Sequence, residues 1–333
     1  MDSDTIPQSE GASSCEHITQ TLSIHEQRII DLLKGEKSKY HLDPSASSRV
    51  RFLDTFEYTE ALRPELTIAA SAGGTFSQEI FDEKLRNITG KRTRDGVIAV
   101  HTKEWDGGEW RNRTAEELQE TSDHEKTHGM LKPFVRKADN YEFRQSGCKE
   151  ETYLEGKKIK TKGHILYESQ TQLLTLYGAH PDARSFSELL KYDKGNSNAA
   201  LNMLALANLL DLAFPDFQGG VEFLADQYFS CDQNFLNNVF TNIESYHEKQ
   251  IPKELKDVIV ENGNNSFDFR KHSIEFSENI MELRDVVVPE NPVEALGNMM
   301  RELKGQTAPP TSEQMEKLRK IAEDMQSSSD PHE

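Results

Sequence analysis

Residues 121–131 read TSDHEKTHGML and contain the pattern H-E-x-x-H, formed by His124, Glu125 and His128. Two histidines four positions apart on a helix project from one face, one turn from each other. They can therefore share one tetrahedral zinc ion as ligands. The glutamate that follows the first histidine lies beside them and can act as a general base on a zinc-bound water. This chemistry requires that the pattern lie on a helix and that a third ligand approach the same face.

The surrounding residues predict the required helix. Thr114 can cap its N-terminus, and Glu117 lies three positions later, where the partner of a capping box belongs. Nothing between residue 115 and Gly129 interrupts a helix, so H-E-x-x-H falls in its last turns. Before this helix, GVIAVHT (96–102) is short, rich in β-branched residues and bounded by glycine-containing turns. It predicts a β-strand close in sequence to the site.

The third ligand is expected from a second helix. GHILYESQTQLLTLYG (163–178) lies between two glycines and has a wide apolar surface, which predicts a helix packed on the core. Glu168 falls within or beside that surface, where a carboxylate needs a cation or another partner. We therefore expect the helix around 164–177 to bring Glu168 against the two histidines. Alternatives for the third ligand are His164, one turn before Glu168, and Glu150 and Glu151 in an expected loop.

The rest of the chain is predicted to be mainly helical. The charged segment 133–162 is expected to be irregular, 185–247 to be helical with a break near FPDFQGG (214–220), and 254–287 to hold one or two short strands. We expect an α+β, mainly helical fold in which a small sheet in the N-terminal half packs on the H-E-x-x-H helix. The predicted parts are a disordered N-terminus (1–20), a catalytic domain (21–182), a helical domain (183–287), and C-terminal helices with a flexible tail (288–333).

Composition limits the partners and the location. The formal net charge of −18 over 333 residues disfavours nucleic acids and anionic lipids and favours a basic partner or substrate. No run of 18 apolar residues is present, so no membrane insertion is expected, and the polar N-terminus lacks the pattern of a signal peptide. We expect a monomer that is cytoplasmic or that is secreted by a non-classical or translocated route. Three separated cysteines (Cys15, Cys148 and Cys231) indicate a reducing compartment, and Cys148 is a further candidate nucleophile.

A strand, an H-E-x-x-H helix followed by glycine, and a later helix with Glu168 and Gln172 together resemble the gluzincin branch of the zincin metalloproteases. The resemblance covers about residues 96–178, and the five-residue motif is its specific part. It implies zinc as the cofactor, and it implies that the edge of the preceding strand binds extended substrate. The implied site residues are the zinc ligands His124, His128 and Glu168 and the general base Glu125.

The chain departs from the usual pattern of this family at two points. Lys126 stands where an uncharged residue is usual, and the spacing from His128 to Glu168 is longer than in the commonest form. The third histidine of the metzincin branch is absent from its position, which Phe134 occupies. The candidates for stabilising an oxyanion are Tyr153, Tyr167 and His180.

The predicted function is the hydrolysis of peptide bonds in a protein or peptide substrate by a zinc-activated water, with Glu125 as the general base. The alternative is a non-enzymatic, acidic, helical interaction protein, such as a translocated effector, in which the HEKTH sequence is fortuitous. Zinc content separates the two, because the interaction protein needs no metal.

Overall fold

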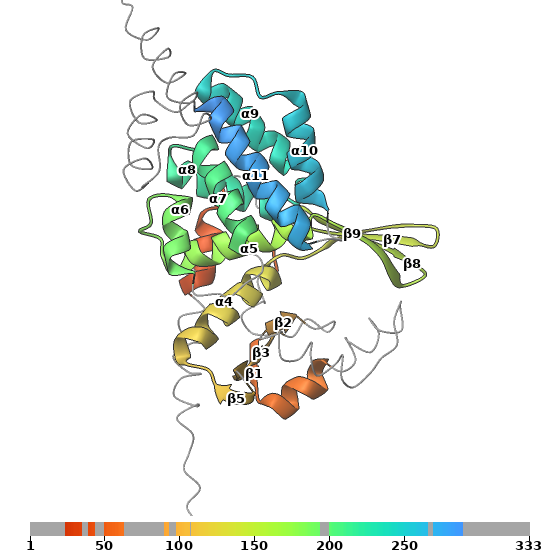
Figure 1. Cartoon of the computed structure of the whole chain (residues 1–333). Helices are drawn as coiled ribbons and strands as arrows, with labels where there is room; N and C mark the ends of the chain where they lie inside the picture. The colour runs from red at the N-terminus through yellow and green to blue at the C-terminus, as the bar shows by residue number, and fades with distance from the viewer. Residues whose placement is uncertain are drawn as a thin grey trace, which may run out of the picture.

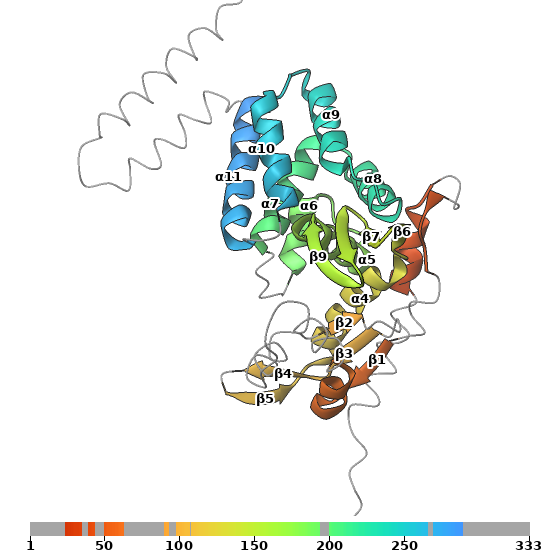
Figure 2. The ribbon, with the colours of Figure 1, turned by 90° about the vertical axis from the view of Figure 1, so that its right-hand side faces the viewer.

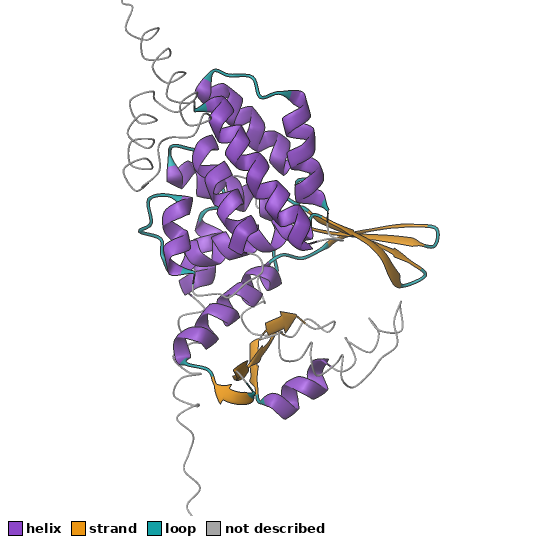
Figure 3. Cartoon of the chain, viewed as in Figure 1, coloured by secondary structure: helices purple, strands orange, loops and turns teal. Residues whose placement is uncertain are grey.

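A computed structural model describes residues 24–34, 39–43, 50–62, 90–92, 98–106, 108–193, 200–265 and 269–288 (Figure 1). The described part is a mainly helical α+β protein with small sheets, as predicted (Figure 3). The predicted disordered N-terminus (1–20) lies outside the described residues, and so do the predicted C-terminal helices and tail (288–333) except for Val288. No helix among the described residues has the length and apolar character needed to cross a membrane.

Among the described residues, five helices form a bundle (Figures 1 and 3). Helix α11 packs against α7 and α10, and α7 also contacts α9. Their bounds are α7 (Ala200–Ala213), α8 (Phe217–Phe229), α9 (Phe235–His247), α10 (Lys253–Asn264) and α11 (Phe269–Val287).

The prediction of short strands within 254–287 is wrong, because the helices α10 and α11 occupy this segment. The buried apolar residues of α11 recur at intervals of four, three and four positions, which is the spacing of one helix face. They are Phe276, Ile280, Leu283 and Val287.

Helix α5 (His164–Ala179) lies between this bundle and α4 (Ala115–Met130). It packs against α7 and α8 on one side and α4 on the other, and most of its residues are buried. One continuous hydrophobic core runs from Ile29 to Val287, so it crosses the predicted boundary between residues 182 and 183 without a break. The short α6 (Phe186–Leu189) and the 3-10 turn η3 (Leu190–Tyr192) continue the chain there.

The predicted N-terminal sheet lies on the other side of α4. It has the order β1-β3-β2, with β1 (Val50–Leu53) parallel and β2 (Gly90–Arg92) antiparallel to β3 (Ile98–His101). The predicted strand 96–102 is β3, whose four residues are all buried. Both β2 and β3 contact α4. The hairpin of β4 (Lys103–Asp106) and β5 (Glu109–Asn112) then leads into α4.

The expectation that 96–102 offers a substrate-binding edge is wrong for the described sheet. Strand β3 is hydrogen-bonded on both sides, to β1 and to β2, so its backbone is not free to bind a peptide. Among the described strands, β2 is the outer strand that contacts α4. Within the described sheet, the outer edge beside α4 is therefore that of β2, and it is the candidate edge for a peptide.

The prediction that the segment 133–162 is irregular is wrong. It forms a four-stranded antiparallel meander that projects from the molecule (Figures 1 and 2). Two-residue loops join its strands, which is the connection expected of tight hairpins. Gly163 ends the meander and precedes α5 with φ 67°, and a Cβ atom there would lie 2.4 Å from the Cys148 carbonyl oxygen. The strands are β6 (Phe134–Ala138), β7 (Tyr141–Ser146), β8 (Lys149–Leu154) and β9 (Lys157–Lys162).

Candidate metal centre

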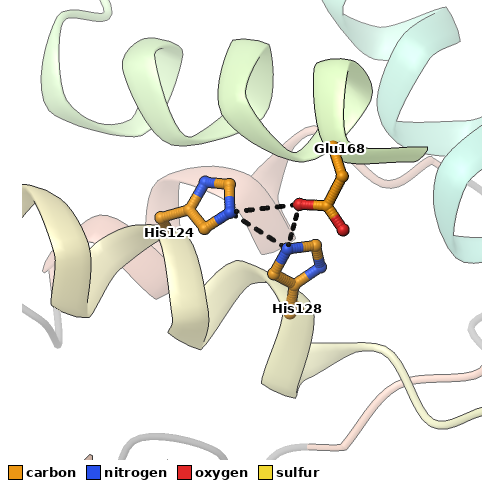
Figure 4. A group of neighbouring side chains, drawn as sticks. All are labelled: His124, His128 and Glu168. Atoms are coloured by element: carbon orange, nitrogen blue, oxygen red, sulfur yellow. Dashed lines mark hydrogen bonds and ion pairs between the residues drawn. The ribbon is translucent and has the colours of Figure 1, made fainter. Parts of the chain in front are cut away.

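Helix α4 begins as the sequence predicts. Thr114 caps it, the Glu117 amide donates to the Thr114 hydroxyl, and the Glu117 carboxylate accepts from the Thr114 amide. The helix ends at Met130, so the H-E-x-x-H pattern lies in its last turns. The two histidines of the pattern face α5 (Figure 4).

Glu168 completes the group, as expected from the buried face of α5. Its Oε2 lies 3.2 Å from His128 Nε2 and 3.5 Å from His124 Nε2 (Figure 4). The two Nε2 atoms lie 3.0 Å from each other. The expected approach of Glu168 to both imidazoles is confirmed, and His124, His128 and Glu168 form a group that could hold a metal ion.

The spacing of these three atoms fits a small tetrahedral metal. Nitrogen and oxygen ligands about 2.0–2.1 Å from a tetrahedral ion lie roughly 3.3 Å from one another. The three separations of 3.0, 3.2 and 3.5 Å bracket that value. Two imidazoles and one carboxylate leave a fourth position for water or substrate, which distinguishes catalytic from structural zinc sites.

Gln172 sets the orientation of His124. The His124 Nδ1 atom lies 2.7 Å from Gln172 Oε1. Gln172 Nε2 donates to Asp193 Oδ1 at 3.0 Å, and because a carboxylate only accepts, the amide oxygen must face the imidazole. His124 therefore donates through Nδ1 and presents the lone pair of Nε2 to the site.

Thr171 sets the orientation of His128. The His128 Nδ1 atom lies 3.2 Å from Thr171 Oγ1, and this hydroxyl donates to the Tyr167 carbonyl at 2.8 Å. The hydroxyl proton is thus engaged, so Nδ1 is the donor and Nε2 presents its lone pair. Two nitrogen lone pairs and a carboxylate oxygen at these distances repel each other unless a cation lies among them.

The other candidates for the third ligand lie elsewhere. His164 Nδ1 is 3.5 Å from Glu168 Oε1, whereas the two histidines contact Oε2, so His164 contacts Glu168 and is not part of the group. Glu150 and Glu151 lie in strand β8 and not in the expected loop. Glu151 accepts from Lys158 Nζ at 3.2 Å and from the Tyr153 hydroxyl at 3.1 Å.

Lys126, the departure within the motif, packs on the opposite side of α4. It is fully buried, and its Nζ lies 2.9 Å from Glu26 Oε2 in the helical segment 24–31. The neighbouring Thr127 contacts the same segment, with Oγ1 3.1 Å from His25 Nε2. The lysine therefore fixes the side of α4 opposite to the two histidines and does not obstruct the face that carries them.

A cavity of about 610 Å³ adjoins two of the three residues of the group, His128 and Glu168. Glu125 lies on its wall, and within the described residues its carboxylate accepts no hydrogen bond. Of the oxyanion candidates, Tyr167 lines the cavity, with its ring centroid 4.8 Å from that of His128. Tyr153 bonds Glu151, and His180 stacks on Tyr192 at the far end of α5.

Cys148 is not placed as a nucleophile. It is buried, and its thiol contacts the Gly163 carbonyl. Burial raises the pKa of the Cys148 thiol well above its usual value, so the reactive thiolate is disfavoured. The cysteine alternative is therefore not supported.

Sequence reasoning missed the residues that orient the ligands, Thr171 and Asp193. Thr171 carried a usable signal, because it is a polar residue three positions after Glu168 and therefore lies near it on the same face of the predicted helix. Asp193 carried none, since it reaches the site only through the fold.

Without a metal, the group favours a bound proton. Burial by itself lowers the pKa of His124, but the hydrogen bond to Glu168 and the charges of Glu125 and Glu168 raise it to about 9. Burial raises the pKa of Glu168, but His128 and His124 hold it well below its usual value. At neutral pH the metal-free group therefore carries a proton on His124 next to an ionised Glu168.

Metal binding should release this proton. Because Nε2 of His124 must lose it to become a ligand, the apparent zinc affinity should rise roughly tenfold per pH unit up to about pH 9 and then level off. Calorimetric titration with zinc in two buffers of different ionisation enthalpy should show release of about one proton at neutral pH. An affinity that is constant over this range would contradict the assignment.

Removing the Gln172 acceptor should weaken the centre. Gln172→Leu should lower zinc affinity about 10–100-fold, as is typical when the outer partner of a ligating histidine is lost. Gln172→Glu combined with Asp193→Asn is the matched control, because it keeps an acceptor oxygen toward His124 and a donor–acceptor pair between positions 172 and 193, and it should retain most of the affinity. Competition with a chromophoric chelator measures both. Equal weakening by the two variants would contradict an orienting role for this hydrogen bond.

No family model, no curated protein and no solved structure matches this chain. A function can therefore be argued only from the site itself.

Proposed function

We propose that this chain is a zinc-dependent metallopeptidase. The observation that carries the proposal is the convergence of His124, His128 and Glu168 at ligand separations, with Glu125 on the wall of the adjoining cavity. Two imidazoles and one carboxylate suit zinc, and the orienting hydrogen bonds occupy both Nδ1 atoms, so Nε2 is the atom of each ring that can bind an ion. The arrangement resembles a gluzincin centre in ligands and in the position of the base.

Zinc, when bound, supplies Lewis-acid activation of the substrate carbonyl and of the attacking water. Glu125 acts as the general base: its carboxylate takes a proton from the water as the C–O bond forms. The same carboxyl group then gives that proton to the departing nitrogen as the C–N bond breaks. Within the described residues Glu125 has no competing hydrogen bond, so its carboxylate is available for both transfers.

Strand β2 supports the binding of an extended peptide. Lys91 of β2 lines the same cavity as Glu125 and His128. A peptide that pairs with the outer edge of β2 would pass beside the centre in extended form, with its backbone hydrogen-bonded to the sheet. His164 and Tyr167 also line the cavity and are the candidates for contacting the developing oxyanion.

Metal removal tests the proposal. The zinc-loaded chain should hydrolyse a mixture of fluorescence-quenched peptides, lose this activity on treatment with a chelator, and regain it with one equivalent of zinc. Far-ultraviolet circular dichroism should show that the fold survives chelation, because the core does not depend on the ligands. A chain that binds no zinc and cleaves nothing would instead be the non-enzymatic interaction protein.

A further inference from the structure

The lining of the cavity beside the centre holds more basic than acidic side chains, although the chain as a whole carries a net charge of −18. Four basic side chains line it against three carboxylates. One of these carboxylates, Glu168, is a metal ligand in the proposed function, and another, Glu125, is the base. The four basic side chains are Lys91, Arg144, Lys149 and Lys158.

Three of the basic residues come from neighbouring strands of the meander. Arg144 lies on β7, directly across from Glu151 on β8, and Lys149 and Lys158 lie on β8 and β9. Lys149 Nζ is 4.8 Å from the centre of the Tyr167 ring, and that ring packs against His128. The ammonium group of Lys149 is therefore separated from His128 by the Tyr167 ring.

Glu151 does not neutralise the basic side chains that the meander contributes to the cavity. It is shared between Lys158 at 3.2 Å and Lys149 at 3.7 Å. Burial raises the pKa of Glu151, but these two lysines hold it below its usual value. One carboxylate thus faces two ammonium groups. Arg144 is paired with Glu142 at 2.5 Å, so the surplus of positive charge on the meander comes from its lysines.

Lys91 adds a positive charge from the opposite element. It lies on β2, the outer strand next to α4, and within the described residues it forms no ion pair. A peptide between β2 and the meander would therefore have an ammonium group on each side, Lys91 on one and Lys149 on the other. With a divalent ion at the centre, the surplus of positive charge is larger still.

We propose that this cavity selects peptides with acidic side chains next to the scissile bond, whose carboxylates bind Lys149 on the meander and Lys91 on β2. This inference rests on the proposed metallopeptidase function for its reaction, but the binding preference follows from the charges on the wall. A carboxylate between partly buried ammonium groups gains charge-assisted hydrogen bonds, whereas a basic side chain meets repulsion.

Binding tests the preference without hydrolysis. The zinc-loaded Glu125→Gln chain is titrated into fluorescein-labelled peptides, blocked at both ends, that carry glutamate, glutamine or lysine on either side of an apolar pair. Anisotropy should show the glutamate peptide binding at least tenfold more tightly than the glutamine peptide, and the lysine peptide binding most weakly. The preference should decrease with added salt.

Variants on two separate elements locate the preference. Combined with Glu125→Gln, the substitutions Lys91→Glu and Lys149→Gln should each reduce the preference for the glutamate peptide over the glutamine peptide about tenfold. Lys160→Gln is the matched control, because Lys160 is an exposed lysine of β9 outside the cavity lining, and it should change nothing. Equal affinity for the glutamate and glutamine peptides, or a preference that both variants leave intact, would overturn the inference. A glutamine peptide with a free C-terminal carboxylate that binds as tightly as the blocked glutamate peptide would also overturn it.

Cleavage by the active chain separates this inference from the proposed function. If the acidic peptides bind preferentially but no peptide is hydrolysed, the peptidase is wrong and the anion-binding cavity stands. If the glutamate and glutamine peptides bind and are cleaved alike, the peptidase stands and the selectivity is wrong. Circular dichroism and zinc content of each variant show whether it is folded.

Discussion

Glu125→Gln should lower the rate of peptide hydrolysis by about 10²–10⁴-fold, the usual contribution of a general base. The substitution keeps the shape of the side chain but removes its ability to take a proton from water. Glu125 is not among the grouped ligand atoms, so zinc content should stay at the wild-type level. Initial rates on a quenched peptide, measured with metal content and a circular dichroism spectrum of the same sample, test this.

The matched control is Glu116→Gln, an exposed glutamate in the first turn of the same helix. It makes the same chemical change in α4 but lies far from the cavity, so hydrolysis should be unaffected. A zinc-loaded Glu125→Gln chain that hydrolyses peptide at the wild-type rate would remove Glu125 from the reaction.

Loss of a ligand should affect metal binding more than any other change. His124→Ala, His128→Ala or Glu168→Ala should each weaken zinc binding by more than about 100-fold, because a direct ligand contributes more than the 10–100-fold typical of its outer partners. Hydrolysis should fall with the zinc occupancy. The fold should persist, because the continuous core does not include these three side chains.

Substitutions of two other histidines are the controls for this loss of zinc affinity. His180→Ala changes a histidine at the other end of α5 and should leave zinc affinity unchanged. His164→Ala removes a contact to Glu168 Oε1 and should have a smaller effect than loss of a ligand, about tenfold. Competition with a chromophoric chelator ranks all five variants. Wild-type affinity in His128→Ala would end the assignment of the centre.

The elements of the site were predictable because their signals are local. Thr114 and Glu117 stand at capping-box spacing, and the histidines follow without an interruption. The position of Glu168 followed from an energetic argument, since a carboxylate on a buried helix face needs a cation. The predicted approach of Glu168 to both histidines is confirmed, and the metal ion among them stays a prediction.

The meander was missed because its two outer strands, β6 and β9, are exposed on both faces. All five residues of β6 and nearly all of β9 are exposed, so no alternation of apolar and polar residues marks them as strands. The usable signals were the turns. Asp139, Gly147, Glu155 and Gly156 all adopt positive φ, and Ser-Gly and Glu-Gly dipeptides at regular spacing are typical of tight hairpins.

The order of strands around β3 could not be predicted from residues near it. Strand β1 is separated from β3 by more than 40 residues, and it pairs with β3 through Val50 and Ile98. Such contacts depend on the path of the whole chain and leave no local pattern. The same holds for Glu26, which gives the buried Lys126 its partner from the helical segment 24–31.

Diffraction from crystals of the zinc-loaded chain, measured above and below the zinc absorption edge, tests the centre most directly. We expect one anomalous peak that is present only above the edge. It should lie about 2.0–2.2 Å from His124 Nε2, His128 Nε2 and a carboxylate oxygen of Glu168, with a fourth position toward the cavity. Zinc-saturated crystals with no peak among these three residues, or with zinc bound by other side chains, would contradict the metallopeptidase.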